Sequence, residues 1–163
     1  MNLDNEIGIS IMKIVEELDS GPVSNIYKFK LENNKNFQEI SERLSLLAAE
    51  KVLDEIDNIL DDSARFIDQE HSKATYAKKI DKAEGAINWN DKADIILGKI
   101  NGLSPSPGAF FTFDGERYKV LKAEISNGLG IAGEVLNDKL EIACSYNKSL
   151  KILEIQRQGK KPQ

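Results

Sequence analysis

The sequence predicts the final part of an α/β domain followed by a small all-β barrel, and two patterns of apolar residues support this fold class. Between residues 37 and 60 the apolar side chains recur three or four positions apart, which is the period of an amphipathic helix. After Gly108, apolar and polar residues alternate in short runs, which is typical of strands. The expected parts are an α/β portion over residues 1–62, a linker over 63–84 and a barrel over 85–163.

Two strands are expected before the helix. Residues 8–15 are rich in β-branched side chains, and residues 23–31 form a second run of this kind. Gly21 and Pro22 predict a turn between them, since glycine tolerates a positive φ and proline does not continue a strand. The long helix needs more than two strands to cover its apolar side. This part of the chain is therefore expected to be the tail of an α/β domain and not a whole one.

The second part is expected to hold one helix and five strands. The helix would be capped by Asn90 or Asp91 and reach Ile100, and the glycines and prolines after it predict a loop. Asp114-Gly115 predicts a tight hairpin turn. The expected strands are residues 111–113, 118–123, 133–136, 140–144 and 150–155. This number of short strands is typical of an OB-like barrel, and a small SH3-like barrel is the alternative.

Composition excludes several classes of protein. A single cysteine, Cys144, allows no disulfide within the chain, and its place in an apolar run predicts a small buried side chain. A single histidine, His71, excludes sites that need two histidines, and no metal site is expected. No apolar run approaches the roughly 20 residues of a membrane-spanning helix, and the N-terminus is unlike a signal peptide. A cytoplasmic protein with no membrane association is expected.

Charge is distributed unevenly along the chain, although the net charge is only −5. Residues 1–70 hold 7 Lys/Arg against 16 Asp/Glu, a net charge of −9. Residues 71–163 hold 15 Lys/Arg against 11 Asp/Glu, a net charge of +4. The basic part could meet a polyanion, and two ordinary solvated surfaces are an equally good interpretation at this point.

Several segments, taken in order, resemble a known enzyme family. They are residues 8–12 with 18–21, 74–80, 85–89, 104–109, and 150–156 with 159–161. Together they resemble the C-terminal part of the methionyl-tRNA formyltransferases over essentially the whole chain. The resemblance implies the last part of a Rossmann-like catalytic domain, followed by an OB-like barrel that helps to hold tRNA.

The resemblance also implies an activity and a catalytic residue. Methionyl-tRNA formyltransferases transfer a formyl group from 10-formyltetrahydrofolate to the amino group of methionyl initiator tRNA in translation initiation. Of the family's catalytic Asn, His and Asp, only the Asp matches a residue here, Asp19, and His71 comes too late in the sequence to substitute. The chain is therefore expected to be a truncated part, inactive alone and monomeric as a full-length protein. The alternative for Asp19 is a turn residue that caps Gly21.

The resemblance further implies contacts between basic side chains and the sugar-phosphate backbone of tRNA, which position the RNA without reading its sequence. The expected tRNA-binding residues are Lys78, Lys79, Arg117, Lys119, Lys151, Arg157, Lys160 and Lys161. For each of them, a solubilising surface residue is the alternative. Five aromatic residues offer a stacking platform for bases as a further alternative, but core packing is favoured. They are Phe110, Phe111, Phe113, Tyr118 and Tyr146.

Two other functions remain open from the sequence. The first is a stand-alone module that binds tRNA or single-stranded nucleic acid without catalysis, which the basic second part favours. The second is a related folate enzyme that acts on another amine or on water. The Gly159-Lys160-Lys161 ending favours the tRNA enzyme over this relative, because the ending is part of the family motif.

Overall fold

The structure, a computed structural model, describes residues 1–32 and 34–163, which fall into two compact units. The hairpin unit comprises residues 5–31 and 40–79, and the C-terminal unit comprises 80–163 with 1–4 and 32–39. Within these described ranges, no helix is both long and apolar enough to cross a lipid bilayer. The same residues hold no group of three or more histidine, cysteine, aspartate or glutamate side chains suited to a metal ion.

The hairpin unit contains two antiparallel strands, β1 (Glu6–Met12) and β2 (Val23–Lys30). The prediction of a strand as far as residue 15 is wrong, since Lys13 N–H donates to the Pro22 carbonyl over 2.9 Å and closes the pairing. Beyond this bond the chain leaves the sheet as a loop, in which the Ile14 side chain is 96% exposed.

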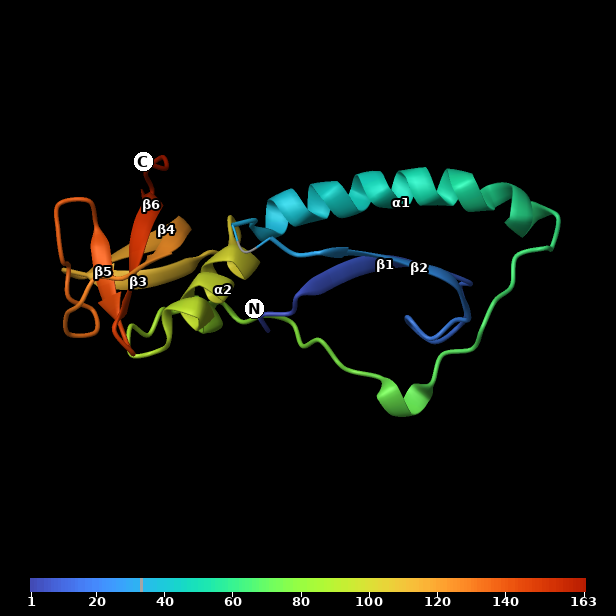
Figure 1. Cartoon of the computed structure of the whole chain (residues 1–163), viewed down its shortest axis with the longest axis horizontal. Helices are drawn as coiled ribbons and strands as arrows, with labels where there is room; N and C mark the ends of the chain where they lie inside the picture. Colours follow the sequence, from blue (N-terminus) through green and yellow to red (C-terminus); the bar gives the residue numbers. More distant parts are fainter. Residues whose placement is uncertain (33) are drawn as a thin grey trace. The chain divides into compact units, whose positions relative to one another are not determined.

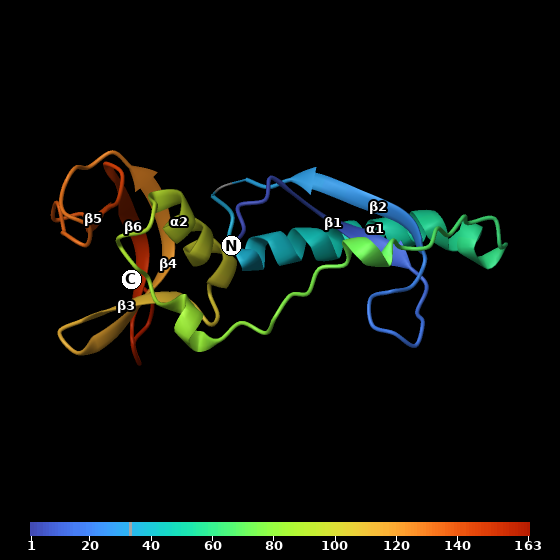
Figure 2. The ribbon, with the colours of Figure 1, turned by 90° about the horizontal axis from the view of Figure 1, so that it is seen from below.

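Helix α1 (Phe37–Leu60) begins and ends at the predicted residues and runs alongside β1 and β2 in both views (Figures 1 and 2). Its apolar stripe is only partly covered: Phe37 and Val52 are 56% and 41% exposed, and the one buried residue of the helix is Glu55. Two strands therefore leave much of this helix exposed, as its long apolar stripe predicts.

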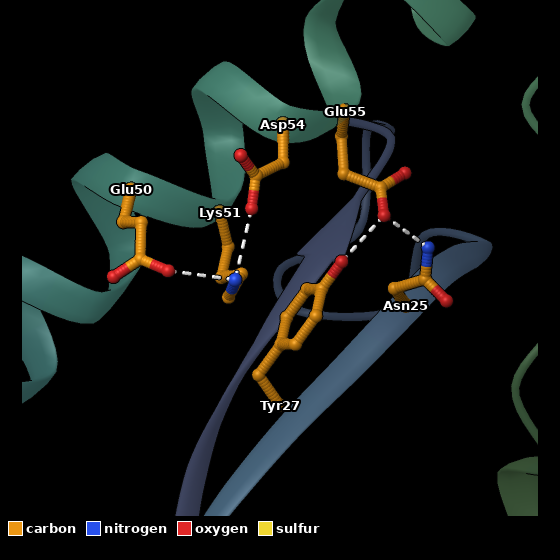
Figure 3. A network of polar contacts seen from close by, with 6 residues as sticks. All are labelled: Asn25, Tyr27, Glu50, Lys51, Asp54 and Glu55. Atoms are coloured by element: carbon orange, nitrogen blue, oxygen red, sulfur yellow. Dashed lines mark hydrogen bonds and ion pairs between the residues drawn. The ribbon is translucent and has the colours of Figure 1, made fainter.

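The buried Glu55 carboxylate joins α1 to β2 (Figure 3). It accepts hydrogen bonds from the Asn25 amide and the Tyr27 hydroxyl, so both polar groups of the strand are satisfied. The hydrogen bond to Glu55 raises the pKa of Tyr27. One turn earlier, Lys51 Nζ lies 2.7 Å and 2.8 Å from two carboxylates of its own helix, which raise its pKa. We interpret the cluster as structural, because each of these charged groups has a partner within it.

The segment between the two expected domains follows the hairpin unit for part of its length. Val23 and Ile67 exchange two backbone hydrogen bonds of 2.8 Å and 2.9 Å, so the chain after α1 pairs with β2. Two short 3-10 helices follow, η1 (His71–Lys73) and η2 (Lys82–Gly85). The bounds expected for the linker, residues 63–84, stay a prediction.

The C-terminal unit is a four-stranded antiparallel half-barrel with one helix. Its elements are α2 (Ala93–Leu103), β3 (Ala109–Phe113), β4 (Glu116–Ser126), β5 (Glu141–Cys144) and β6 (Lys148–Arg157). The strand order is β3-β4-β6-β5, and α2 lies against β4 and β6 (Figures 1 and 2). The predicted hairpin turn is confirmed: Asp114 and Gly115 have φ of 49° and 74°, which glycine adopts without strain.

One side of α2 and the inner face of the sheet form the core. Ile100 and Leu103 on the helix and Val120 and Leu150 on the strands are 0% exposed. The expectation for Cys144 is confirmed, because its side chain is 3% exposed and lies in this core. Burial raises the pKa of the Cys144 thiol to about 11, since the charged thiolate loses its hydration.

Three sequence predictions for this unit are wrong in detail. Residues 133–136 form no strand, because Gly133 has φ of 89° and the segment keeps only an isolated bridge between Val135 and Ile142. Helix α2 follows Lys92 and not a cap at Asn90 or Asp91, which belong to a turn that precedes it. The helix also continues past Ile100 to Leu103.

A carboxylate anchors the loop between β4 and β5, and this anchor predicts an acid-sensitive unit. Glu141 accepts from Ser149 Oγ over 2.6 Å and from Asn137 Nδ2 over 2.7 Å. These hydrogen bonds, that of Ser149 first, lower the pKa of Glu141 to about 2. Because the folded pKa lies below the ordinary value of 4.5, this stabilisation is full above pH 4.5 and is lost between pH 4.5 and pH 2.

We expect Glu141→Gln to remove part of this acid dependence. Urea unfolding followed by Trp89 fluorescence reports on the C-terminal unit, because Trp89 packs against its core and is the chain's single tryptophan. Between pH 5 and pH 3, the urea midpoint should fall less in Glu141→Gln than in the wild type. Asp138→Asn, an exposed change in the same loop, serves as the control. Equal acid dependence of wild type and Glu141→Gln would contradict the assignment.

Candidate functional site

Asp19, the expected catalytic residue, lies in the loop that joins β1 and β2. Its φ is 56°, so it occupies the left-handed region that Asp and Asn tolerate, and its side chain is exposed. The loop is tightly closed: a Cβ on Gly21 would lie 1.8 Å from the Lys13 carbonyl oxygen, so only glycine fits there. The structure thus holds the Asp19 carboxylate at the surface on a constrained turn.

Gln69, which the sequence analysis did not single out, fixes this loop. Its Nε2 donates to the Asp19 carbonyl over 2.9 Å and to the Gly21 carbonyl over 2.8 Å. One side-chain amide therefore satisfies two backbone acceptors on either side of Ser20. No sequence signal pointed to this role, because Gln69 is 48 residues away from Gly21 along the chain.

Replacing Gln69 by glutamate removes both donors and sets a carboxylate against two carbonyl oxygens. Each lost hydrogen bond weakens the closed loop, so we expect amide exchange at Val23 and Ile67 to become about 10-fold faster. The measurement is hydrogen–deuterium exchange by NMR. His71→Ala, an exposed change two residues away, should leave exchange at both amides unchanged. Unaltered exchange in Gln69→Glu would show that the loop does not depend on this amide.

A basic cavity on the C-terminal unit brings four of the expected tRNA-binding residues together. Its volume is about 360 Å³. The lining residues come from β4, β6 and the turn after β6, and they are Arg117, Lys119, Gln156, Arg157, Gln158, Gly159 and Lys160. Four of these seven carry a positive charge, so the cavity is suited to an anionic ligand.

Strand alternation and one turn build this cavity. Arg117 and Lys119 are two residues apart on β4 and so point to the same face. After β6 the chain turns at Gly159, whose φ is 73°. Backbone hydrogen bonds of 3.0 Å, from Gln158 to Arg117 and from Lys160 to Arg157, hold the turn against β4 and β6.

The cations of the cavity differ in how far they are neutralised. Arg157 forms an ion pair with Glu116, which lowers the pKa of that carboxyl and raises the pKa of Arg157. Tyr118 donates to the same carboxylate over 3.0 Å, and this hydrogen bond raises the pKa of Tyr118. The Arg117 guanidinium instead lies 3.5 Å from the centre of the Phe110 ring. Arg157 therefore has an internal counter-charge, whereas Arg117 packs on an aromatic face.

The other expected tRNA-binding residues lie elsewhere. Lys151 forms a 2.9 Å ion pair with Glu124. Lys161 follows the Gly159 turn and is exposed. Lys78 and Lys79 are exposed residues of the hairpin unit. The structure thus brings four of the eight residues into one cavity and leaves the other four outside it.

The aromatic residues are divided between core and surface. Phe111 stacks on Tyr118 at 5.6 Å and meets Trp89 edge-on at 5.8 Å. Phe111 packs against the buried core, which confirms core packing for this residue, whereas Tyr118 is half-buried. The expected inward position of Phe113 is wrong, because Phe113 lies beyond the core beside the hairpin turn and is 68% exposed. Tyr146 is 76% exposed, so core packing is also wrong for this residue.

Comparison with known proteins places these features in context. The family model described as "Formyl transferase, C-terminal domain" matches residues 79–163. A methionyl-tRNA formyltransferase from Pelagibacter ubique (strain HTCC1062) is 58% identical over 163 residues, which is 100% of this chain and 53% of that protein. The chain spans about half the length of the curated relatives it matches.

Two solved structures are similar in fold. HypX from Aquifex aeolicus in complex with tetrahydrofolic acid matches with a TM-score of 0.74 and 20% identity, over 98% of this chain and 28% of HypX. A methionyl-tRNA formyltransferase from Clostridium thermocellum matches with a TM-score of 0.57 and 21% identity, over 78% of this chain and 55% of that protein. At these identities the two likenesses show the fold alone.

Proposed function

Because the chain belongs to the formyl transferase family, with the C-terminal portion of methionyl-tRNA formyltransferase as its counterpart, we propose that it forms part of an enzyme of translation initiation. That enzyme transfers the formyl group of 10-formyltetrahydrofolate to the amino group of methionyl initiator tRNA. The single observation that carries the proposal is the 58% identity to the Pelagibacter ubique enzyme over the whole chain. A full-length, monomeric, cytoplasmic protein is part of the same proposal.

Within this enzyme, Asp19 would act on the proton-transfer step. The attacking amine must lose a proton to a base, and the tetrahedral intermediate needs a donor for its oxyanion. A carboxylate serves neither as that donor nor as a strong base, but it orients and polarises a neighbouring base. The described loop around Asp19 offers the carboxylates of Glu16, Glu17 and Asp19 together with backbone carbonyls, and these acceptors do not suffice to hold a folate ring. The binding pocket of the formyl donor is therefore assigned to no residue of this chain.

The C-terminal unit would hold the tRNA, and its half-barrel would be the main part of an OB-like barrel. The clustering of Arg117, Lys119, Arg157 and Lys160 around one cavity supports this role. Contacts of this kind hold the RNA through its phosphates. They weaken as the salt concentration rises, because the counterions that binding releases then gain less free energy. Lys78, Lys79, Lys151 and Lys161 would add weaker contacts outside the cavity.

Two measurements test the proposal. In the first, residues 1–163 replace the corresponding portion of the Pelagibacter ubique enzyme, and formyl transfer to methionyl-tRNA is assayed. The chimera should be active, and residues 1–163 alone should be inactive. In the second, fluorescence anisotropy measures tRNA binding by residues 1–163 at 50, 100 and 200 mM KCl, and affinity should fall steadily with salt. An inactive but folded chimera, or tRNA binding that ignores salt, would contradict the proposal.

A further inference from the structure

We propose that the cavity between β4, β6 and the Gly159 turn binds one phosphodiester of the RNA backbone, and that Arg117 is its anchor. This inference rests on the proposed function, since that function supplies the RNA. It adds a ranking of the basic residues: Arg117 is expected to dominate, while Arg157, which lines the same cavity, contributes little.

The first argument is that the Arg117 guanidinium is held in place before any ligand arrives. Its Cζ lies 3.5 Å from the centre of the Phe110 ring, and the Arg117 carbonyl accepts a backbone hydrogen bond from Gln158. Its Nε is buried and has no hydrogen-bond partner in the ranges the structure describes. A guanidinium with fixed geometry and reduced hydration loses little entropy and little hydration when it binds an anion. Its two terminal nitrogens then offer a planar fork for phosphate oxygens.

The second argument is the balance of charge around the cavity. Glu116 is the carboxylate nearest in the sequence to Arg117, and both Arg157 and Tyr118 already bind it. Lys119 and Lys160 also line the cavity, and neither forms an ion pair with another of the residues that the structure describes. The Lys119 stem packs over Gly108, where a Cβ would lie 2.8 Å from Lys119 Cδ. The site therefore has three cations free for a ligand and one that is internally paired.

The third argument concerns the class of ligand. A cavity of about 360 Å³ is at the lower end of the range for small-molecule sites, roughly 300–1,000 Å³, and exceeds what a lone phosphate fills. Gln156 and Gln158 also line the cavity. Gln156 Nε2 already donates to the Lys160 carbonyl over 2.9 Å, which leaves its amide oxygen and the Gln158 amide for sugar hydroxyls. A phosphodiester with its flanking riboses matches both the charge and the size of the cavity. Contacts of this kind do not read the base sequence.

The test compares tRNA binding by four forms of the 163-residue chain: wild type, Arg117→Ala, Arg117→Lys and the control Lys139→Ala. Lys139 is an exposed lysine outside the cavity, so its loss removes the same charge. We expect Arg117→Ala to weaken binding about 10-fold and to lower the salt slope by about 1. Arg117→Lys should recover the slope but not the affinity, because lysine lacks the fork. Lys139→Ala should change affinity less than twofold.

Further variants separate binding from folding and from the proposed function. Phe110→Leu keeps every charge but removes the ring under Arg117, and it should weaken binding with an unchanged salt slope. If wild type binds tRNA but Arg117→Ala and Lys139→Ala bind it with equal affinity, the inference is overturned and the proposed function stays intact. No binding by a folded wild type overturns both. A competition experiment tests the class of ligand. If poly-glutamate displaces tRNA as readily as single-stranded RNA of equal charge does, the assignment to a phosphodiester is overturned.

Discussion

Formyl transfer by the chimera is expected to slow by about 10²–10⁴-fold in kcat when Asp19 is replaced by asparagine. Asparagine keeps the size of the side chain and tolerates the φ of 56°, so the loop should keep its shape. What it removes is the negative charge that orients and polarises the base. The KM for methionyl-tRNA should stay within about twofold, because Asp19 is not expected to bind the RNA.

Asp62 supplies a matched control for this experiment. It has φ of 59° and is exposed, so Asp62→Asn makes the same chemical change in the same backbone conformation. Steady-state rates for both variants, measured with circular dichroism to verify folding, decide between two roles for Asp19. If Asp19→Asn retains full kcat, then Asp19 is a turn residue and the catalytic assignment fails.

Truncating Leu150 to alanine is expected to destabilise the C-terminal unit by about 2–5 kcal/mol. Leu150 is 0% exposed near the start of β6 and belongs to the same buried cluster as Val120 and the inward residues of α2. Its loss removes apolar contacts and leaves a cavity that a four-stranded sheet with a single helix can only partly close. Urea unfolding monitored by Trp89 fluorescence measures the change in this unit.

Leu153→Ala is the control, because it deletes the same atoms from the same strand at a position that is 42% exposed. A cost below about 1 kcal/mol is expected there. Similar costs at positions 150 and 153 would show that the core does not lie where the structure places it.

The sequence specified the elements whose signals are local. The apolar period over residues 37–60 predicted α1 to the residue, and Asp114-Gly115 fixed the β3–β4 hairpin. That turn also sets Phe113 opposite Glu116, which places Phe110 opposite Lys119 and diagonal to Arg117. The aromatic support of Arg117 could therefore have been found from the register, although the sequence analysis did not use it.

Features that depend on contacts between distant residues could not be predicted from local sequence patterns. Gly102 was expected in the loop after the helix, yet α2 continues through it. The missing side chain leaves room for Met1, whose Cγ would lie 2.7 Å from a Cβ there. The pairing of Arg157 with Glu116 joins residues 41 positions apart, and it decides which cation of the cavity is neutralised. Core packing was also expected for Phe113, but the core ends before that residue, which is 68% exposed.

The buried Cys144 thiol can report on local opening of the C-terminal unit. A thiol that is 3% exposed, with its pKa raised to about 11, cannot react with a disulfide reagent while the sheet is closed. Labelling therefore proceeds only through opened states, and its rate follows how often β5 and β6 separate. Since the chain has no second cysteine, each modified molecule records one such opening.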